Sequence, residues 1–468
     1  MNSSAWRDLI GTITSPFVGV LKSVSCARPV VRNLGSNVFG FLVAIFFQVI
    51  TVPVLLMCWG SEIYGIWILA STIPAFIAMS DVGLTTSATS SMIEKITAKD
   101  RAGANTIFLT TFFSLAAIAI VLSVIAIFLI QGVILPDLHF SDGYLGVRSV
   151  VTLLIFFGAA ALISAAIHAG FCAFDRYATG TMLLSGIRLV ESSSTICVAL
   201  AGGSLIDAAV ALVTIRALSA IGQGLLLFRL VPWLQFNIRG FSRQVLEALL
   251  RPSIATMAMP AALAVYLQGV PLVIGLAISP AMVTQFTVIR TMSRFPMQIL
   301  SMFNHAILPV TARAHFAGDL HSIEKYVGLT ILSSAVVGVG SALFLSVFGS
   351  GVIYLWTNGR IVPEPVLLFS LVAVMAVNVV WHPLSNLLMI VNHAAAYAPL
   401  FLALTAFAVL AVLAVLTVFG VWAIAMPLIA LELIMLAIVL RGIGLVLFKQ
   451  RNAREIFLAI WRATLEAF

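Results

Sequence analysis

The sequence predicts an all-α polytopic membrane protein, with about twelve transmembrane helices in two six-helix lobes related by a parallel pseudo-two-fold repeat. Three observations carry this prediction. The composition is 62% hydrophobic and only 9% charged, apolar runs of spanning length follow one another along the chain, and polar landmarks recur at a nearly constant offset. Globular proteins carry about 25% charged residues, so the composition excludes a water-soluble fold.

The apolar runs define the predicted spans in order, since a spanning helix needs about 20 apolar residues. They lie at 34–57, 64–92, 105–131, 148–172, 180–203, 206–231, 253–277, 281–309, 327–356, 365–391, 397–419 and 421–447. The second run is the least regular, because Pro74 and Asp81 interrupt it and a small, polar segment follows. We therefore expect a kinked or broken helix there.

These runs divide the chain into predicted regions. They are an N-terminal cytoplasmic or interfacial segment (1–33), an N-lobe with spans one to six (34–231), a cytoplasmic linker (232–252), a C-lobe with spans seven to twelve (253–447) and a C-terminal cytoplasmic amphipathic helix (448–468). The first segment lacks the apolar core and cleavage site of a signal peptide. The four cysteines have no paired spacing, which predicts neither a disulfide framework nor a zinc site.

The basic residues predict the orientation in the membrane. With both termini cytoplasmic, most of the 25 Lys and Arg residues fall in cytoplasmic segments, and the predicted outer loops hold only Arg148 and Arg360. This bias also accounts for the net charge of +8, because basic residues next to a bilayer face anionic headgroups. We therefore expect a lipid bilayer, and no nucleic acid, as a partner.

The two halves of the chain resemble each other in their polar landmarks. Pro53 in the first span corresponds to Pro271 in the seventh, and Asp100 after the second span corresponds to Asp319 after the eighth, at nearly the same offset. Six spans per half return the chain to the same side of the membrane. Transporters built from such parallel repeats place their substrate site between the halves.

The eighth span carries a polar stripe. At 100° per residue, six polar side chains share an arc of about 80°, namely Thr287, Arg290, Arg294, Gln298, Ser301 and His305. Charged residues inside a span are costly and usually face a cavity or a partner. Because a guanidinium group matches phosphate oxygens, two arginines one turn apart could hold a diphosphate. Alternatively, Arg290 and Arg294 pair with acids on neighbouring helices and only pin the bundle.

Charged residues in the fifth and sixth spans allow two interpretations each. Arg188 and Glu191 are three residues apart, so we expect them to neutralise each other on their own helix. The alternative is that Arg188 faces a cavity while Glu191 takes up a proton or a sodium ion. Arg216 in the sixth span either lines a cavity or extends its head group toward the interface.

Two further carboxylates lie in predicted spans. Asp81 is either a helix cap, which the following Gly83 favours, or an ion-coupling group. Glu432 is nearly alone in the apolar twelfth span, which suits either proton coupling or an arginine partner from another span. Asn378 and His382 belong to an uncharged polar stripe in the tenth span. Such residues suit contact with sugar hydroxyls, but hydrogen bonds between helices are their commoner use.

The resulting candidate sets are the following. The candidate substrate-binding residues are Arg188, Arg216, Arg290, Arg294, Gln298 and His305, and the candidate ion-coupling residues are Asp81, Glu191 and Glu432. No nucleotide loop, metal motif or nucleophile–base arrangement occurs in the sequence. We therefore predict a protein that is not an enzyme, with no cofactor and no metal site, driven by H⁺ or Na⁺ coupling where a gradient is used.

Several short motifs resemble one transporter family. The segment WGSEIYG (59–65), followed by Asp81-Val82-Gly83-Leu84, is similar to the polysaccharide-exporter branch of the multidrug/oligosaccharidyl-lipid/polysaccharide flippase superfamily. That branch has a Gly…Tyr-Gly turn after its first span and an Asp-x-Gly in its second. In the second half, Ile307-Leu308-Pro309-Val310 followed by Asp319 resembles the family's Pro…Asp passage. The resemblance extends over roughly residues 34–445.

The resemblance implies an alternating-access flippase of two six-helix lobes. Its implied cargo is an undecaprenyl-diphosphate-linked oligosaccharide, such as an O-antigen or exopolysaccharide repeat unit, which crosses the bacterial inner membrane with its diphosphate held by Arg290 and Arg294. The implied partners are this lipid-linked oligosaccharide and the polymerase and chain-length proteins of the same pathway, and the transporter itself is expected to be a monomer.

Two alternatives belong to other functional classes. A cation-coupled multidrug antiporter of the same fold is disfavoured by the excess of embedded arginine over acid. A membrane polysaccharide polymerase or glycosyltransferase is disfavoured because the predicted outer loops are short.

Overall fold

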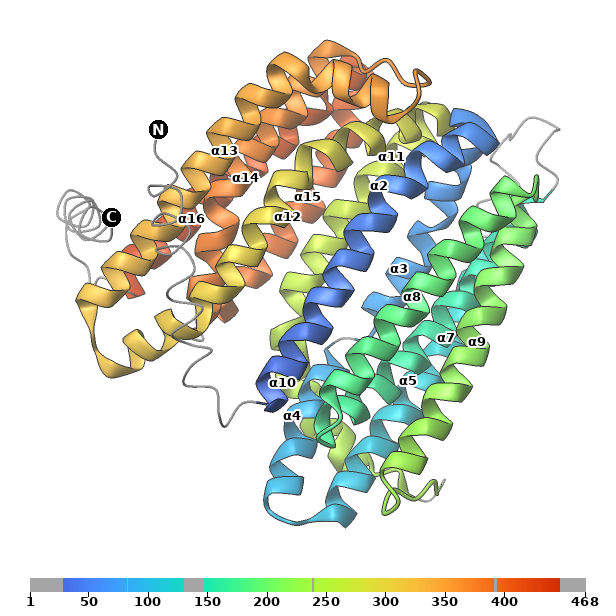
Figure 1. Ribbon diagram of the computed structural model, residues 1–468, viewed down its shortest axis with the longest axis vertical. Coiled ribbons are helices and arrows are strands. Elements are labelled where there is room, and N and C mark those ends of the chain that lie inside the picture. Colours follow the sequence, from blue (N-terminus) through green and yellow to red (C-terminus); the bar gives the residue numbers. More distant parts are fainter. Residues whose placement is uncertain (1–27, 82, 130–145, 238–239, 391–393, 447–468) are drawn as a thin grey trace, which may run out of the picture.

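The computed structural model consists of helices joined by short connections, and it describes residues 28–81, 83–129, 146–237, 240–390 and 394–446 (Figure 1). The first half holds α2 (Arg28–Ala70), α3 (Thr72–Met79), α4 (Leu84–Thr97), α5 (Arg101–Leu129), α7 (Val147–Ala173), α8 (Tyr177–Leu200) and α9 (Leu205–Leu230). The second half holds α10 (Arg243–Ala264), η4 (Val265–Gly269), α11 (Val270–Ala277), α12 (Pro280–Ala317), α13 (Leu320–Trp356), α14 (Pro365–Ile390), α15 (Ala394–Phe419), η5 (Val421–Ile424) and α16 (Ala425–Val446). The all-α prediction is confirmed, since no strand occurs in these ranges.

The helices account for all the predicted spans within the described residues. Ten stretches are long and apolar enough to cross a membrane, and the first of them, Gly35–Thr97, contains two of the predicted spans. The eighth predicted span lies in α12, which is 38 residues long but is not among the ten, in keeping with its polar stripe. The chain is therefore a multi-pass membrane protein.

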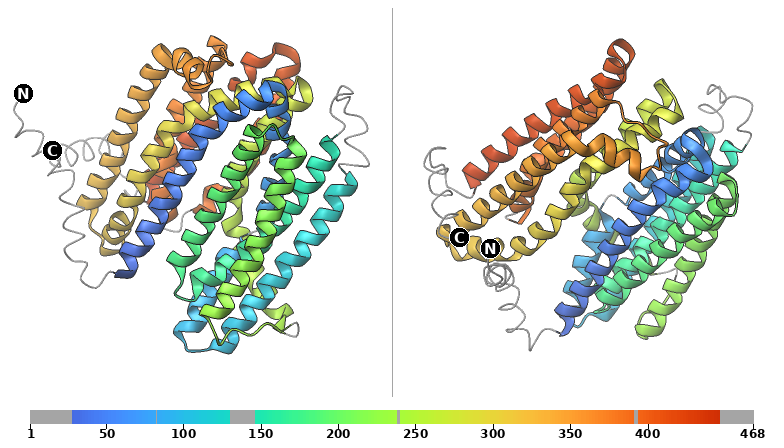
Figure 2. Two further views of the ribbon diagram at one scale, coloured as in Figure 1. Left: turned by 45° about the vertical axis from the view of Figure 1, so that its right-hand side comes forward. Right: turned by 45° about the horizontal axis from the view of Figure 1, so that its top comes forward.

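The helices form two lobes that lie side by side, as the views in Figures 1 and 2 show. The helices α2–α9 make up the N-lobe, and α10–α16 make up the C-lobe. At the boundary, α2 packs against α12 and α4 packs against α10. The first predicted span thus meets the eighth, and the second meets the seventh. This reciprocal pairing is what a pseudo-two-fold relation between the halves requires.

The second predicted span is broken, as expected. α2 continues past its first apolar run through a non-helical Gly60 (φ 76°, ψ 177°), and the chain breaks again between α3 and α4, where Gly83 has a φ of 71°. Asp81 accepts hydrogen bonds from the backbone N–H of Thr85 (2.9 Å) and from the Thr85 hydroxyl. This is the geometry of the helix-cap interpretation, because the carboxylate satisfies a backbone donor in the first turn of α4.

The two repeat loops have the same local structure. Asp100 accepts a hydrogen bond from the N–H of Gly103 (2.8 Å) at the start of α5, and Asp319 accepts one from the N–H of Ser322 (3.1 Å) at the start of α13. The residue before each Asp has a left-handed backbone, with a φ of 60° at Lys99 and 71° at Gly318. These hydrogen bonds lower the pKa of both carboxyl groups, which lie outside the spans. The offset in the sequence therefore marks a repeated turn.

Replacing Lys99 by glycine is expected to stabilise the protein. A side chain in the left-handed region costs about 1 kcal/mol, and the matching position in the other lobe is already Gly318. We expect a higher apparent melting temperature of the purified chain in detergent. Ala98→Gly is the matched control, because Ala98 has a φ of −76° and glycine there should only lower the melting temperature. Equal shifts for the two variants would contradict this explanation.

The lobes share an extensive apolar core at one end, whereas at the other end α10 is the C-lobe helix that packs into the N-lobe core. The shared cluster joins Leu55 and Ile66 of the N-lobe to Phe286 and Ile353 of the C-lobe. Toward the opposite end, the cluster around Trp381 contains described residues of the C-lobe alone. The lobes are therefore joined most closely at the end where α2 kinks at Gly60.

Close contacts seal that end. A Cβ atom at Gly65 would lie 1.8 Å from the carbonyl oxygen of Pro280, so α2 and α12 approach each other there in a way that only glycine allows. Beside this contact, the Thr284 hydroxyl of α12 donates a hydrogen bond to the carbonyl oxygen of Ser61 in α2 (2.6 Å). We call the contacts of Ser61 and Gly65 with Pro280 and Thr284 the inter-lobe seal.

The connection between the lobes is shorter than the predicted linker. α9 ends at Leu230 and α10 begins at Arg243, so the second half of the predicted linker (232–252) is already helical. The hydroxyl of Ser242 accepts a hydrogen bond from the N–H of Val245 (3.4 Å) at the start of α10. The predicted C-terminal helix (448–468) and most of the predicted N-terminal segment (1–33) lie outside the described residues.

Candidate functional site

The two arginines of the eighth predicted span point into the C-lobe. Arg290 donates a hydrogen bond from Nη1 to the carbonyl oxygen of Leu267 (2.7 Å), and its guanidinium lies 5.3 Å from the centre of the Phe286 ring. The guanidinium of Arg294 lies 5.9 Å from the centre of the Tyr266 ring. Within the described part of the chain, neither arginine forms an ion pair with a carboxylate at 4.0 Å or less. The described residues therefore do not show the alternative in which Arg290 and Arg294 form ion pairs with acidic residues on neighbouring helices.

The carbonyl oxygen that Arg290 binds belongs to Leu267 in the single π-helical turn η4, and it lies four residues before Pro271. In an α-helix the carbonyl of Leu267 would accept from the N–H of residue 271, and Pro271 has none. The same relation holds in the other half, where Pro53 leaves the carbonyl of Val49 without its helical donor. That carbonyl accepts the indole N–H of Trp356 (2.8 Å). In both halves, the carbonyl four residues before the proline thus accepts a hydrogen bond from a side chain of another helix.

Glu432 of α16 lies at the centre of a polar network inside the C-lobe. Its side chain is buried, with only 2% of the residue exposed. It accepts hydrogen bonds from Asn378 Nδ2 (2.9 Å) and from the indole N–H of Trp381, both on α14. The hydroxyl of Tyr266 in η4 also hydrogen-bonds to it, and Arg294 is close enough to act on its charge. One carboxylate therefore links four elements of the lobe.

A small cavity adjoins this network. It has a volume of about 30 Å³ and is lined by Tyr266, Arg290, Arg294 and Asn378 among others. A cavity of that size has room for one or two water molecules, at about 10–15 Å³ each. A diphosphate does not fit there, so in this conformation the two arginines line a site for water or a small ion.

The rest of the stripe on α12 separates into different environments. Gln298 donates a hydrogen bond from Nε2 to Oε1 of Gln48 on α2 (3.0 Å), which joins the two lobes. The hydroxyl of Ser301 donates to the carbonyl oxygen of Gln298 (2.7 Å). The side chain of His305 lies outside the described residues. The six polar side chains predicted to share one face thus do not share one cavity.

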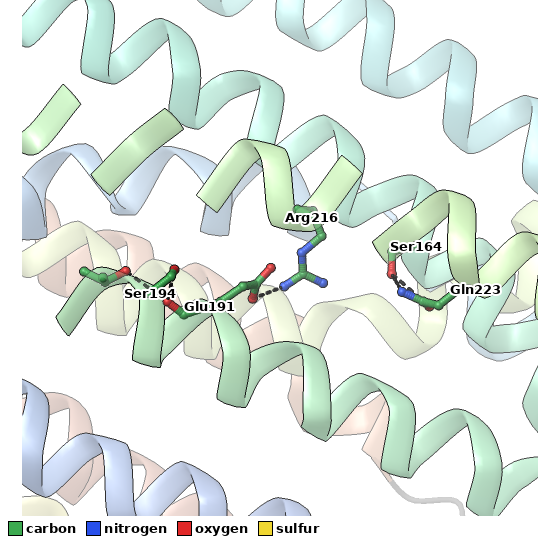
Figure 3. Close-up of polar contacts among 6 residues, drawn as sticks. Ser164, Glu191, Ser194, Arg216 and Gln223 are labelled. Carbon is green, nitrogen blue, oxygen red and sulfur yellow. Dashed lines mark hydrogen bonds and ion pairs between the residues drawn. The ribbon is translucent and has the colours of Figure 1, made fainter. Parts of the chain in front are cut away.

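The N-lobe contains a buried ion pair between neighbouring helices. Arg216 Nη2 of α9 lies 2.6 Å from Glu191 Oε2 of α8, and Figure 3 shows the two side chains facing each other. The guanidinium also lies 5.0 Å from the centre of the Phe157 ring of α7. Two turns along α9, Gln223 donates to the hydroxyl of Ser164 on α7 (2.8 Å; Figure 3). The partner of Glu191 is therefore Arg216, in place of the Arg188 that the sequence spacing suggested.

The side chain of Arg188 is exposed. It lies on the side of α8 that packs against the rest of the protein. Its neighbours along that side, Ser185, Glu191 and Thr195, are buried. The exposed apolar residues Met182, Val190 and Leu200 lie on the opposite side of the helix, which is the lipid side. Arg188 therefore does not face the lipid side, and charged residues in a span usually face a cavity or a partner. Arg188 is thus a candidate for contact with a solute between the lobes.

The two lobes have matching sets of charges. The middle spans of the N-lobe hold Arg188, Glu191 and Arg216, and those of the C-lobe hold Arg290, Arg294 and Glu432. Each set has one arginine more than it has carboxylates. No group of three or more His, Cys, Asp or Glu residues that could hold a metal ion occurs among the described residues.

Three members of the C-lobe network, Asn378, Tyr266 and Trp381, were not among the predicted site residues. Tyr266 and Trp381 are aromatic, and aromatic residues in a span are ordinarily read as core or interface. Their polar atoms became important only because Glu432 lies opposite them. Trp381 follows Asn378 by one helical turn, so the polar stripe of the tenth span contained a signal for it.

The fold is similar to that of solved membrane transporters. This chain is similar to the structure of an inward-facing multidrug resistance MATE family transporter of the MOP superfamily, with a TM-score of 0.63 and 16% sequence identity. The match covers 87% of this chain and 96% of that transporter. An outward-facing MATE transporter of the same superfamily is equally similar, at a TM-score of 0.63 and 14% identity, covering 91% and 96%.

A third solved structure is similar to this chain over most of its length. It is a MOP superfamily transporter from Pyrococcus furiosus, with a TM-score of 0.60 and 15% identity, covering 89% of this chain and 96% of that one. Its binding pocket is described as having reverse polarity, suggesting a different function. No protein-family model and no curated protein matches the sequence. The chain thus has the two-lobe fold of MATE transporters, and the fold does not distinguish the polysaccharide-exporter branch from them.

Proposed function

We propose that this protein is an ion-coupled, alternating-access antiporter that exports amphipathic compounds across the bacterial inner membrane. The fold that it shares with multidrug resistance transporters over most of its length supports this proposal. The observation that carries it is the Glu432 site, a buried carboxylate that accepts hydrogen bonds from neutral donors on two other elements. This corresponds to the alternative considered from the sequence, in place of the flippase that the motifs implied.

Glu432 is suited to couple ion uptake to movement. A carboxylate only accepts hydrogen bonds, whereas a protonated carboxyl group donates one. When Glu432 takes up a proton, one of its oxygens becomes a donor, and the negative charge that strengthens its hydrogen bonds with Asn378 and Trp381 is lost. The negative charge near Arg294 disappears at the same time. The two protonation states thus favour different packings of η4 and α12 against α14, which is the differential interaction that a coupled transporter needs.

The closed end of the molecule supports an inward-open state. The inter-lobe seal lies at the end of α2 remote from Lys95, Arg101 and Arg176, the predicted cytoplasmic basic residues. With this orientation the start of α2 at Arg28 and the end of α16 at Val446 lie on the cytoplasmic side, and the seal faces the outer side. A cycle would then open the seal while bringing together the C-lobe and N-lobe cores at the cytoplasmic end.

The proposal is tested by replacing Glu432 with Gln, which keeps the size of the side chain but cannot take up a proton. In proteoliposomes, we expect movement of the lipophilic cation ethidium under an imposed pH or sodium gradient to fall to the level of protein-free vesicles. Glu364→Gln, at an exposed position before α14, is the control and should transport as the unchanged protein does. Transport that survives Glu432→Gln would contradict the assignment of Glu432. Failure of the unchanged protein to move ethidium under either gradient would contradict the antiporter proposal.

The excess of arginine favours a second candidate, the lipid-linked oligosaccharide flippase. Arg188 is exposed toward the protein interior, and each lobe has an arginine that its glutamate cannot balance. A solute with a phosphate group would complement this charge. The solved transporter with a pocket of reverse polarity indicates that this fold does not fix the charge of its cargo. Polymerase and chain-length proteins would then be the pathway partners.

The two candidates differ in which residues the cargo needs. If the cargo is a diphosphate-linked lipid, Arg188→Gln and the double replacement Arg290→Ala with Arg294→Ala should each abolish flipping of a fluorescent polyprenyl-diphosphate oligosaccharide in proteoliposomes. The antiporter proposal instead expects the unchanged protein not to flip this lipid.

A further inference from the structure

The N-lobe has an apolar groove that the transport site does not use. It lies between α5, α7 and α9, has a volume of about 420 Å³ and is lined by side chains that are all apolar, with aromatic rings at Phe108, Phe112, Phe228 and Phe236. The volume falls within the range of about 300–1,000 Å³ that small-molecule sites occupy. On its outer side, Ile221 and Leu225 are 62% and 68% exposed, so the groove opens onto the lipid-facing surface of the lobe.

Basic side chains stand at one end of this groove. Arg101 is the first residue of α5 and lies two turns before Phe108 on the same face of that helix. Arg229 lies one turn after Leu225 on the same face of α9. Both arginines are exposed. The two helix ends are adjacent, because the guanidinium of Arg101 lies 5.9 Å from the centre of the Trp233 ring just beyond α9.

Asp100, the carboxylate next to Arg101 in the sequence, already has two partners. Asp100 lies 3.2 Å from Lys95 Nζ and accepts the N–H of Gly103. Among the described residues, neither Arg101 nor Arg229 forms an ion pair at 4.0 Å or less, so the positive charge of both is available to a ligand from outside. Trp233, which contacts Arg101, is a residue type that is typical of the membrane interface, where headgroups lie.

We infer that this groove binds one glycerophospholipid with an anionic headgroup. One acyl chain lies among the aromatic rings between α5 and α9, and the phosphate and its anionic substituent lie at Arg101 and Arg229. The occupant is a bilayer lipid because the groove opens onto the hydrocarbon of the membrane while its polar end lies at the interface. Basic pockets between spans on the cytoplasmic side are known to select anionic lipids by this arrangement of charge.

The bound lipid would fasten the connection between the lobes. That connection lies over the polar end of the groove, where the N–H of Gln235 donates to Asn105 Oδ1 (3.1 Å) and the N–H of Ser242 donates to the Thr110 hydroxyl (3.1 Å). The ring of Phe236 packs on Phe112, with 5.6 Å between ring centres. A lipid in contact with Phe236 and Arg229 therefore supports the segment that leads from the N-lobe into α10.

The test uses the purified full chain in detergent, to which phosphatidylglycerol or phosphatidylcholine is added. A ligand that binds the folded state raises its melting temperature. We expect a rise of several degrees with phosphatidylglycerol and a smaller rise with phosphatidylcholine, together with one retained phosphatidylglycerol molecule in native mass spectrometry.

Two variants separate the parts of the site. Arg101→Gln with Arg229→Gln should abolish the difference between the two lipids, even if the starting melting temperature changes. Gly224→Leu should fill the groove, because a Cβ atom there meets only Ile167 at 3.8 Å, and it should remove the response to both lipids. Arg360→Gln, an exposed arginine of the other lobe, is the control and should respond as the unchanged protein does.

The inference is overturned if the unchanged protein responds equally to the two lipids, or if the double arginine variant keeps the preference for phosphatidylglycerol. It is also overturned if Gly224→Leu retains the bound lipid. None of these readouts depends on transport, so the inference and the proposed function can fail separately.

Discussion

Replacing Arg216 by Met is expected to lower the free energy of unfolding by about 3–5 kcal/mol, because it leaves the carboxylate of Glu191 buried without its partner. The two groups are only 2.6 Å apart, and the side chain of each is 8% exposed. Methionine retains much of the volume next to Phe157, so packing changes little. The loss should be visible as a lower melting temperature and as less monomeric protein in gel filtration after mild heating.

The chain offers a matched control for this experiment. Arg243 and Glu247 form an ion pair at 2.9 Å whose side chains are 86% and 62% exposed. Breaking it with Arg243→Met should cost well under about 1 kcal/mol, because exposed pairs contribute little. Adding Glu191→Gln to Arg216→Met should recover part of the loss, since a neutral amide costs less to bury than a charge. If Arg216→Met is no more destabilising than Arg243→Met, the buried pair is not a stability determinant.

The fold could be predicted from the sequence because its signals are local and repeated. Each apolar run of spanning length became a helix, and the break near Asp81 was visible in the small and polar residues that follow it. The matching Asp100 and Asp319 indicated the repeat, since both cap a helix after a left-handed residue. Such turns depend on a few neighbouring residues, which a sequence displays directly.

The site was less predictable because its partners come from different helices. The spacing of Arg188 and Glu191 suggested a pair on one helix, but Glu191 bonds to Arg216 of α9. The stripe on α12 was placed correctly on one helical face. A single face can still meet several neighbours, so Arg290 points to η4 whereas Gln298 points to α2. Periodicity gives the direction of a side chain but not what lies opposite it.

The repeated prolines show how a weak sequence signal acquires a physical meaning. Pro53 and Pro271 each remove one backbone donor, and the carbonyls of Val49 and Leu267 accept Trp356 and Arg290. In a membrane an unsatisfied carbonyl costs several kcal/mol, so each proline needs a partner on another helix. One of these bonds connects α13 to α2 across the two lobes, whereas the other holds Arg290 inside the C-lobe. The same backbone feature thus serves the inter-lobe contact in one half and the polar network in the other.

Replacing Gly65 by Val should open the inter-lobe seal. A Cβ atom at this position would lie 1.8 Å from the Pro280 carbonyl oxygen, and because both groups belong to helix backbones, no side-chain rotation can relieve the clash. Overpacking of this kind costs about 1–3 kcal/mol. This cost would destabilise only the conformation in which α2 and α12 touch. A cost of that size shifts a two-state equilibrium by roughly 5–150-fold.

The measurement is the reactivity of a cysteine introduced at Val283, which is fully buried next to the seal, toward a membrane-impermeant maleimide in a background without the native cysteines. We expect Gly65→Val to raise its labelling rate in proportion to the shift. Gly186→Val is the control, because a Cβ atom there meets nothing within 4 Å, and it should leave the rate unchanged. Because the seal is made of backbone contacts, the variant should fold normally and populate the opposite state. If the Val283→Cys site stays protected in a folded Gly65→Val protein, the lobes separate by another route, and the contact of Gly65 with Pro280 is not what holds this end closed.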